Sequence, residues 1–194
     1  MVSKTRDRFI EVARQLFARK GVENTTMNDI AEASDKGRRT IYTYFKSKHE
    51  IFNAVVESES DKVIKRLQVI ASEPVSAHER LKQYILTRFE AVKEVVKRNG
   101  SLRARFFMDI RKVDRARRKI SKREIVLLRE ILQDGVDAGE FKLKDVTRAA
   151  IIMTQTIYGL DKTYISDRLA DRGITPEMMA EEFTQILLFG IIRR

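Results

Sequence analysis

Residues 25–52 read TTMNDIAEASDKGRRTIYTYFKSKHEIF and carry the most informative pattern in the chain. Thr26 is suited to cap the start of a helix, and Asp29, three residues later, completes a capping box with it. That helix is short, because the Asp-Lys-Gly sequence at 35–37 interrupts it after about two turns. A second short helix follows over about residues 38–45. Two helices joined by a short Gly-containing turn predict a helix-turn-helix.

The second of these helices has more polar side chains than a packed core element needs. Only Ile41 and Phe45, four positions apart, are required to hold it against its neighbours. The remaining face offers guanidinium groups for guanine edges or phosphates, hydroxyl groups for phosphates, and a threonine methyl group for thymine. At about 1.5 Å per residue the helix is about 12 Å long, which suits a major groove of about that width. The polar residues are Arg38, Arg39, Thr40, Tyr42, Thr43 and Tyr44.

This segment resembles the DNA-binding domain of the TetR family of transcriptional regulators, without a gap from residue 25 to 52. The family usually has Gly where Asp35 stands and a capping Ser or Thr where Gly37 stands. Asp tolerates a left-handed backbone, so the turn remains feasible, whereas the capping hydroxyl group is lost. The matching residues are Asp29-Ile30-Ala31-Glu32-Ala33, Thr40-Ile41-Tyr42, Tyr44-Phe45 and Ser47-Lys48, preceded by Phe17-Ala18-Arg19-Lys20-Gly21.

The resemblance implies a role for each matching residue. It makes Thr26 a phosphate contact at the start of its helix, and Tyr42 and Lys48 phosphate contacts beside the groove. A purely structural role is the alternative for two residues: Thr26 as a helix cap only, and Tyr44 as a packing residue. The candidate contacts to bases are Arg38, Arg39, Thr40, Thr43 and Tyr44. The expected core residues are Phe17, Ile30, Ile41 and Phe45.

The rest of the chain predicts long helices and no strand. Only two Pro and eight Gly occur in 194 residues, too few helix breakers for a sandwich or a barrel. Apolar residues recur at helical spacing, which predicts about nine helices, the first over about residues 4–20. The later ones cover about 48–70, 76–98, 101–113, 120–138, 145–166 and the chain from 175 onward. The fold class is therefore all-α, with a three-helix DNA-binding domain at 1–47 and a larger regulatory and dimerisation domain at 48–194.

The last two helices are too apolar to bury only one face each. The apolar run at 186–192 covers nearly every azimuth of its helix, and Ile151, Ile152 and Tyr158 add a second face to theirs. A surface helix that is apolar all round requires a partner. We expect a four-helix interface between two copies of the chain, which a palindromic operator also requires. Full burial within one chain is the alternative.

A ligand pocket is expected among the helices near residues 84–108 and 125–165. Plain core packing is the alternative for any aromatic or Met residue there. The net charge of +11 is concentrated at 97–123, a segment that contains 12 basic residues and two acidic ones. That basic segment is a solvated face, an added attraction for DNA, or a site for an anionic effector such as an acyl-CoA or a fatty acid. The candidate pocket residues are Tyr84, Phe106, Phe107, Met108, Met153, Gln155 and Tyr164.

Several function classes are disfavoured by the residues that the chain lacks. It contains no Cys, which excludes a disulfide scaffold, a thiolate zinc site and a cysteine nucleophile. His49 and His78 have no metal-ligand spacing, and no nucleotide-binding, zinc-protease or serine-hydrolase motif occurs. We therefore expect no enzyme, no cofactor and no metal. A charged N-terminus and a longest apolar run of seven residues predict a soluble, cytoplasmic protein that is not bound to a membrane.

These features together predict a sequence-specific regulator of transcription that binds double-stranded DNA and acts as a repressor. The expected mechanism is a homodimer that binds a palindromic operator and is released by a small-molecule effector, lipophilic or anionic. The alternative is a DNA-bound adaptor of the same fold that recruits a protein partner and has no small-molecule effector.

Overall fold

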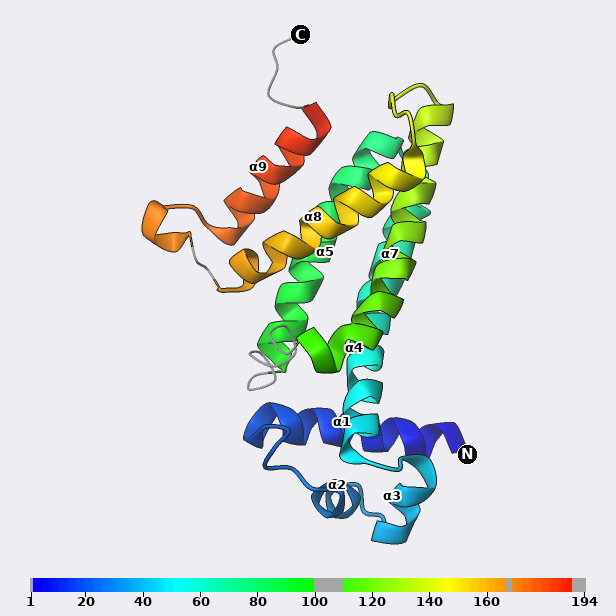
Figure 1. The fold of residues 1–194 in the computed structure, drawn as a ribbon, viewed down its shortest axis with the longest axis vertical. Coiled ribbons are helices and arrows are strands. Elements are labelled where there is room, and N and C mark those ends of the chain that lie inside the picture. Colours follow the sequence, from blue (N-terminus) through cyan, green and yellow to red (C-terminus); the bar gives the residue numbers. More distant parts are fainter. Residues whose placement is uncertain (1, 100–109, 167–168, 190–194) are drawn as a thin grey trace. The chain divides into compact units, whose positions relative to one another are not determined.

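The structure is a computed structural model that describes residues 2–99, 110–166 and 169–189 (Figure 1). These residues form eight α-helices and one 3-10 helix and contain no strand, which confirms the all-α prediction. The helix-turn-helix region consists of α1 (Val2–Lys20), α2 (Met27–Ala33) and α3 (Arg38–Tyr44). The remaining elements are α4 (Lys48–Ala71), α5 (Ala77–Arg98), α7 (Ile110–Asp137), α8 (Val146–Ser166), the 3-10 turn (Ala170–Arg172) and α9 (Pro176–Phe189).

One prediction about the helices is wrong. Separate helices were expected over residues 101–113 and 120–138, but α7 runs without interruption from Ile110 to Asp137. The reason is local: residues 114–119, Asp-Arg-Ala-Arg-Arg-Lys, contain no Gly or Pro and are mostly good helix formers. Polarity alone does not end a helix. Residues 101–109 of the expected helix lie outside the described part of the chain.

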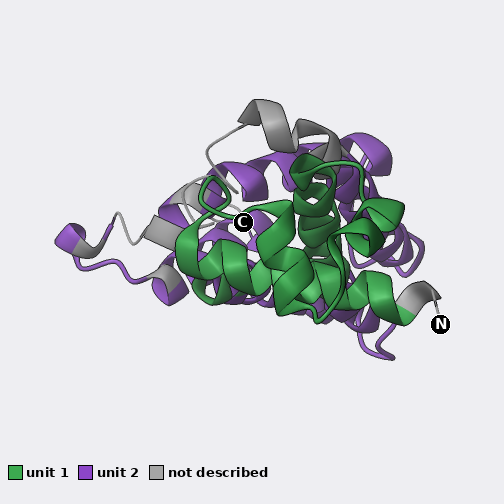
Figure 2. Ribbon diagram, turned by 90° about the horizontal axis from the view of Figure 1, so that it is seen from below, with its two compact units in different colours: residues 1–62, 95–117 green, residues 63–94, 118–194 purple. Residues whose placement is uncertain are grey.

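The chain forms two compact units (Figure 2). Unit 1 comprises residues 1–62 and 95–117, and unit 2 comprises residues 63–94 and 118–194. Helices α4, α5 and α7 each begin in one unit and end in the other. The predicted division at residue 47 falls in the turn before α4, and it stays a prediction about which part binds DNA and which part regulates.

The core of unit 1 joins the first three helices to the start of α4. Phe17, Ile30, Ile41 and Phe45 are buried, as predicted. The ring of Phe17 meets that of Phe52 edge-on, with 6.2 Å between the centroids. Helix α3 packs on this core through Ile41. The opposite face of α3 has no apolar residue to bury, so the polar residues of that face lie at the surface.

The core of unit 2 is built from the apolar stripes of α5, α7, α8 and α9. The ring of Phe89 lies 4.9 Å from that of Tyr164 and 6.3 Å from that of Phe183, so α5 packs against residues of both α8 and α9. No helix in the described part of the chain is both long enough and apolar enough to span a bilayer. Other buried members of this core are Leu81, Ile85, Leu127, Leu128, Ile131, Leu132, Ala150 and Ile157.

Candidate DNA interface and buried polar clusters

The start of α2 is a complete capping box. The Thr26 hydroxyl group accepts a hydrogen bond from the Asp29 amide at 3.1 Å, and the Thr26 amide donates to the Asp29 carboxylate at 2.8 Å. Lys20 also donates to Asp29, at 2.8 Å. These bonds, that of Lys20 first, lower the pKa of Asp29 to about 2. Thr26 is thus a helix cap, as the sequence predicts, and its side chain is at the same time exposed.

The turn between α2 and α3 accommodates the two departures from the family pattern. Asp35 has a φ of 54°, the only positive φ of a non-glycine residue in the described part of the chain. Gly37 occupies the N-cap of α3 and offers no side-chain hydrogen bond. The start of α3 is therefore stabilised by a main-chain hydrogen bond alone, in which the Thr40 amide donates to the Gly37 carbonyl group at 2.9 Å. Both features agree with the sequence prediction.

Helix α3 presents most of the predicted base-contacting residues on one exposed face. Arg38, Arg39 and Thr43 are exposed, Thr40 is half-buried, and Tyr42 is 43% exposed. The guanidinium carbon of Arg38 lies 5.9 Å from the centroid of the Tyr42 ring. The Thr43 hydroxyl group donates to the Thr40 carbonyl group at 2.7 Å, which turns the hydroxyl group back onto the helix. This face therefore carries two arginines and a tyrosine as its longest polar side chains.

Two predicted DNA contacts have partners within the protein. Tyr44 is half-buried, and its ring lies 5.7 Å from that of Phe9 on α1, so Tyr44 has a packing role. The Lys48 ammonium group, at the start of α4, donates to the carbonyl group of Glu23 at 3.1 Å. An ammonium group has three N–H donors, so this contact uses one of the three.

Arg6 is a residue of this region that sequence reasoning missed. Its guanidinium carbon lies 5.2 Å from the ring centroid of Phe45, the C-cap residue of α3. Helical spacing could have indicated this position, because Arg6 stands three and four residues before the buried Phe9 and Ile10. An arginine one turn before the buried face of α1 is therefore held at the C-terminal end of α3.

The candidate pocket residues that the structure describes differ in burial, and their role in a pocket stays a prediction. Tyr84 and Tyr164 are buried in the core of unit 2, Met153 is half-buried, and Gln155 is exposed, with its amide 3.5 Å from the Ser121 hydroxyl group. Phe106, Phe107 and Met108 lie outside the described residues. Within the described chain no group of three or more residues is arranged to hold a metal ion.

A buried ionic cluster lies beside Tyr84, and the sequence analysis did not identify it. We call it the Arg88 cluster: Arg88 of α5, Glu124 of α7, and Asp161 and Tyr158 of α8. Arg88, 1% exposed, binds both carboxylate oxygens of Asp161, and its Nε lies 3.4 Å from Glu124. Its guanidinium carbon also lies 4.6 Å from the ring centroid of Tyr158.

The Arg88 cluster contains more negatively charged groups than positively charged ones. One guanidinium group faces two carboxylates, all of them withdrawn from water. Burial raises the pKa of Glu124 above its usual value, Arg88 opposes this effect, and Asp161 adds to it. Burial likewise raises the pKa of Tyr84, whose hydroxyl group lies 3.4 Å from the Glu124 carbonyl group. Three helices of unit 2 are thus joined through one buried cation.

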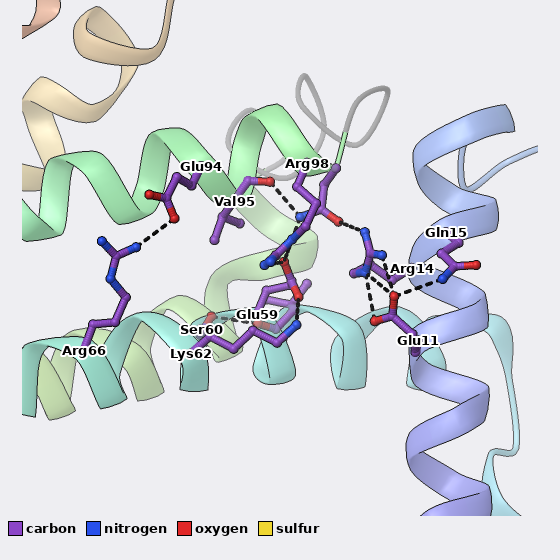
Figure 3. A network of polar contacts seen from close by, with 12 residues as sticks. Glu11, Arg14, Gln15, Glu59, Ser60, Lys62, Arg66, Glu94, Val95 and Arg98 are labelled. Atoms are coloured by element: carbon purple, nitrogen blue, oxygen red, sulfur yellow. Dashed lines mark hydrogen bonds and ion pairs between the residues drawn. The ribbon is translucent and has the colours of Figure 1, made fainter.

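A second buried cluster lies in unit 1 (Figure 3). We call it the Glu59 cluster: Glu59 and Lys62 of α4 together with Arg98 and Asn99 at the end of α5. Glu59, 1% exposed, accepts hydrogen bonds from Lys62 at 2.7 Å, from Asn99 at 3.0 Å and from the guanidinium group of Arg98. The contact extends to α1, because Arg14 Nη1 lies 3.5 Å from the Asn99 amide oxygen.

The exposed apolar side chains of unit 2 lie on its last two long helices. Ile151 and Ile152 of α8 are 42% and 58% exposed, and Ile186 and Phe189 of α9 are 53% and 60% exposed. These positions belong to the apolar faces that the sequence assigns to an interface between two copies. Residues 190–192 of the predicted apolar run lie outside the described part of the chain.

Comparisons with known proteins agree with this geometry. The family model described as "Bacterial regulatory proteins, tetR family" matches residues 9–55. The transcriptional repressor KstR2 of Mycolicibacterium smegmatis is 26% identical over 96% of this chain and 90% of its own. A TetR/AcrR-family regulator from Thermobifida fusca has a TM-score of 0.71 at 27% identity, over 97% of this chain and 98% of that one. The regulator FadR from Bacillus subtilis, in complex with stearoyl-CoA, has a TM-score of 0.71 at 24% identity, over 95% and 98%.

Proposed function

We propose that the chain is a DNA-binding transcriptional regulator of the TetR family, to which its similarity points, and that it is a homodimeric repressor that a small-molecule effector releases from a palindromic operator. The exposed polar face of α3 carries this proposal. Helix α3 has seven residues and only one buried side chain, Ile41, so little of its surface packs against the core. Its two exposed arginines have the fork geometry that binds guanine edges or phosphates in pairs of hydrogen bonds.

The exposed apolar residues of α8 and α9 support the dimer. Two copies that cover these residues against each other bury apolar surface and place two α3 helices on one DNA duplex. Half-sites about one helical turn apart, roughly 34 Å, are the spacing that such a pair reads. Chemical crosslinking and light scattering of the full chain, with Ile152→Glu as the variant, test this point. A monomeric wild-type protein contradicts it.

The contacts to DNA divide into two classes with different signatures. Tyr42→Phe and Lys48→Ala remove phosphate contacts, so they weaken binding to specific and random DNA alike, and Lys48→Ala lowers the salt slope by about 0.9. Arg39→Ala removes a base contact, so it reduces discrimination among operators by about 1–3 kcal/mol. Binding of the full chain to genomic fragments, followed by footprinting, supplies the operator for these measurements.

A matched control comes from α1. Arg6 lies at the end of α3, and Arg8, two residues later, lies on the opposite side of α1 from Arg6. Arg6→Gln and Arg8→Gln remove the same charge from the same helix. A loss of operator affinity from Arg6→Gln alone indicates a local contact, whereas equal losses indicate only the overall attraction of a basic protein.

The class of effector is lipophilic, anionic or both. The basic segment at 97–123 and the stearoyl-CoA complex of the FadR neighbour support an acyl-CoA. Titration of an operator complex with stearoyl-CoA, stearate and a neutral alcohol of equal chain length separates the three chemistries. Release by the neutral alcohol alone excludes an anionic effector, and no release by any of them favours an adaptor that recruits a protein partner.

A further inference from the structure

The exposed side chains of α3 form two pairs along the helix. Arg38 and Tyr42 are four positions apart, and so are Arg39 and Thr43, so the members of each pair lie on the same side of the helix. Successive residues of an α-helix are rotated by about 100°, so the second pair is displaced around the helix axis by that angle. The two pairs therefore meet different parts of any surface on which α3 lies.

The pair of Arg38 and Tyr42 is suited to the DNA backbone. The guanidinium carbon of Arg38 lies 5.9 Å from the centroid of the Tyr42 ring, so this cation is held beside the tyrosine that we expect to contact a phosphate. Phosphate contacts position a protein on DNA and carry no sequence information directly. The exposed residues of α3 that are left to recognise bases are Arg39 and Thr43.

The hydroxyl group of Thr43 has a partner within the helix. It donates a hydrogen bond to the Thr40 carbonyl group at 2.7 Å. A hydroxyl group has one proton to donate, so while this bond exists Thr43 donates neither to a phosphate nor to an acceptor atom of a base. Two kinds of contact are left. The hydroxyl oxygen can accept a hydrogen bond from an amino group of adenine or cytosine, and the methyl group can pack against an apolar group.

Of these two contacts, the methyl contact suits the observed conformation of Thr43 better. The oxygen that would accept from an amino group is turned back onto the helix by its bond to Thr40, whereas the methyl group has no such constraint. Thymine is the one DNA base with a methyl group in the major groove. Contact between the two methyl groups removes apolar surface from water and breaks no hydrogen bond.

We propose that Thr43 is a specificity-determining residue that recognises the C5 methyl group of a thymine through its own methyl group, beside a guanine contact of Arg39. This inference rests on the proposed DNA-binding function. The four positions between Arg39 and Thr43 cover about 6 Å of helix, and base pairs follow one another every 3.4 Å or so. The half-site is therefore expected to contain a thymine within about two base pairs of a guanine.

Replacement of thymine by uracil in the footprinted operator tests this inference, because it removes only the C5 methyl group. Each thymine of the half-site is replaced in turn, at the same position of both half-sites. Affinity is measured for the full wild-type chain, for Thr43→Ser, which lacks the methyl group, and for Thr43→Val, which lacks the hydroxyl group. The matched control is Thr147→Ser, which makes the same change at an exposed residue of α8.

At one thymine position we expect uracil to weaken wild-type binding by about fivefold to twentyfold, as for the loss of one buried methyl group in each half-site. Thr43→Val and Thr147→Ser lose as much as the wild type at this position. Thr43→Ser binds the unmodified operator more weakly than the wild type and loses nothing further on the uracil operator.

Two results overturn the role of Thr43 and leave the DNA-binding function intact. One is an equal effect of uracil in the wild type and in Thr43→Ser, including no effect in either despite tight binding. The other is a loss of the thymine preference in Thr43→Val, which would make the hydroxyl group the recognising group. Failure of the wild type to bind any genomic fragment overturns the proposed function and this inference with it.

Discussion

The Glu59 cluster and the Arg88 cluster contain the same kinds of groups in opposite arrangements. In the Glu59 cluster the central ion is a buried carboxylate, and its cationic partners Lys62 and Arg98 have side chains that are 49% and 45% exposed. In the Arg88 cluster the central ion is a guanidinium group, and neither of its carboxylate partners is more than 4% exposed. The central ion is withdrawn from water in both, but only in the first do its partners remain in contact with water.

This difference determines the direction of the pKa shifts. Burial alone raises the pKa of Glu59, but hydrogen bonds from Lys62, Asn99 and Arg98 together bring it below its usual value. In the Arg88 cluster, burial raises the pKa of Glu124 and a single cation shared with Asp161 does not reverse that effect. A buried carboxylate is thus stabilised as an ion when it has several donors of its own, and destabilised when it competes for one.

The largest expected effect of a single substitution is at the centre of the Arg88 cluster. Arg88→Met leaves two buried carboxylates without a cation and destabilises the protein by about 3–5 kcal/mol. Urea unfolding at pH 7 measures this loss. The combined variant with Glu124→Gln and Asp161→Asn, which has no buried charge at this site, recovers part of the stability. A cost for Arg88→Met below about 1 kcal/mol contradicts the assignment of a closed, water-free cluster.

The sequence predicted most of the helices but neither cluster, and the reason is physical. Helix ends depend on short patterns, such as the Thr26 and Asp29 capping box, which are read locally. Arg88 stands in the apolar stripe of α5, three residues after Ile85, so its position indicates burial. The partners Glu124 and Asp161 come from helices distant in the sequence, and spacing along one helix cannot identify them. Periodicity thus predicts which charges are buried, and tertiary packing selects their partners.

The same distinction applies to the DNA interface. The exposed face of α3 follows from local spacing, because a helix of about two turns in which only Ile41 is buried leaves most of its other side chains exposed. The packing of Tyr44 on Phe9 and the ring contact of Arg6 with Phe45 depend on how α1 crosses α3. Such a crossing is fixed by the shapes of several side chains together, so the sequence left Tyr44 open between two roles and did not identify Arg6.

A smaller effect is expected at the centre of the Glu59 cluster. Glu59→Gln leaves Lys62 and Arg98 without a carboxylate partner, but both cations are partly exposed and remain solvated by water. We therefore expect a loss of about 1–3 kcal/mol, the range for a hydrogen bond to a charged group. Thermal unfolding at pH 7, with Arg66→Gln at the exposed ion pair of Arg66 and Glu94 as the control, measures it. A cost equal to that of Arg88→Met contradicts the difference between the two clusters.

The pH dependence of stability distinguishes the clusters by sign. The lowered folded-state pKa of Glu59 contributes stability above the unfolded value of about 4.3, and that stability is lost as the pH falls through the folded-state pKa. The raised pKa of Glu124 acts in the opposite direction, because stability is lost as the pH rises from about 4.3 through its folded-state pKa.

Stability curves from about pH 2 to about pH 8 measure these opposite slopes, that of Glu59 below about 4.3 and that of Glu124 above it. Relative to the wild type, Glu124→Gln gains stability as the pH rises, by at most about 1.4 kcal/mol per pH unit. Glu59→Gln loses stability relative to the wild type as the pH rises from the folded-state pKa of Glu59 to about 4.3, and the difference is constant above that pH. Parallel curves for the two variants contradict the opposite pKa shifts of Glu59 and Glu124.

The smallest effect is expected where neither charge is buried. Arg66 and Glu94 form an ion pair of 2.7 Å between α4 and α5, with side chains 42% and 66% exposed. Water solvates both ions whether or not they touch, so Arg66→Gln costs about 0–1 kcal/mol, and 1 M NaCl removes most of that cost. Urea unfolding at low and high salt checks both statements. A larger loss, unaffected by salt, indicates that the Arg66 side chain stabilises the protein through packing of its apolar stem and not through its charge.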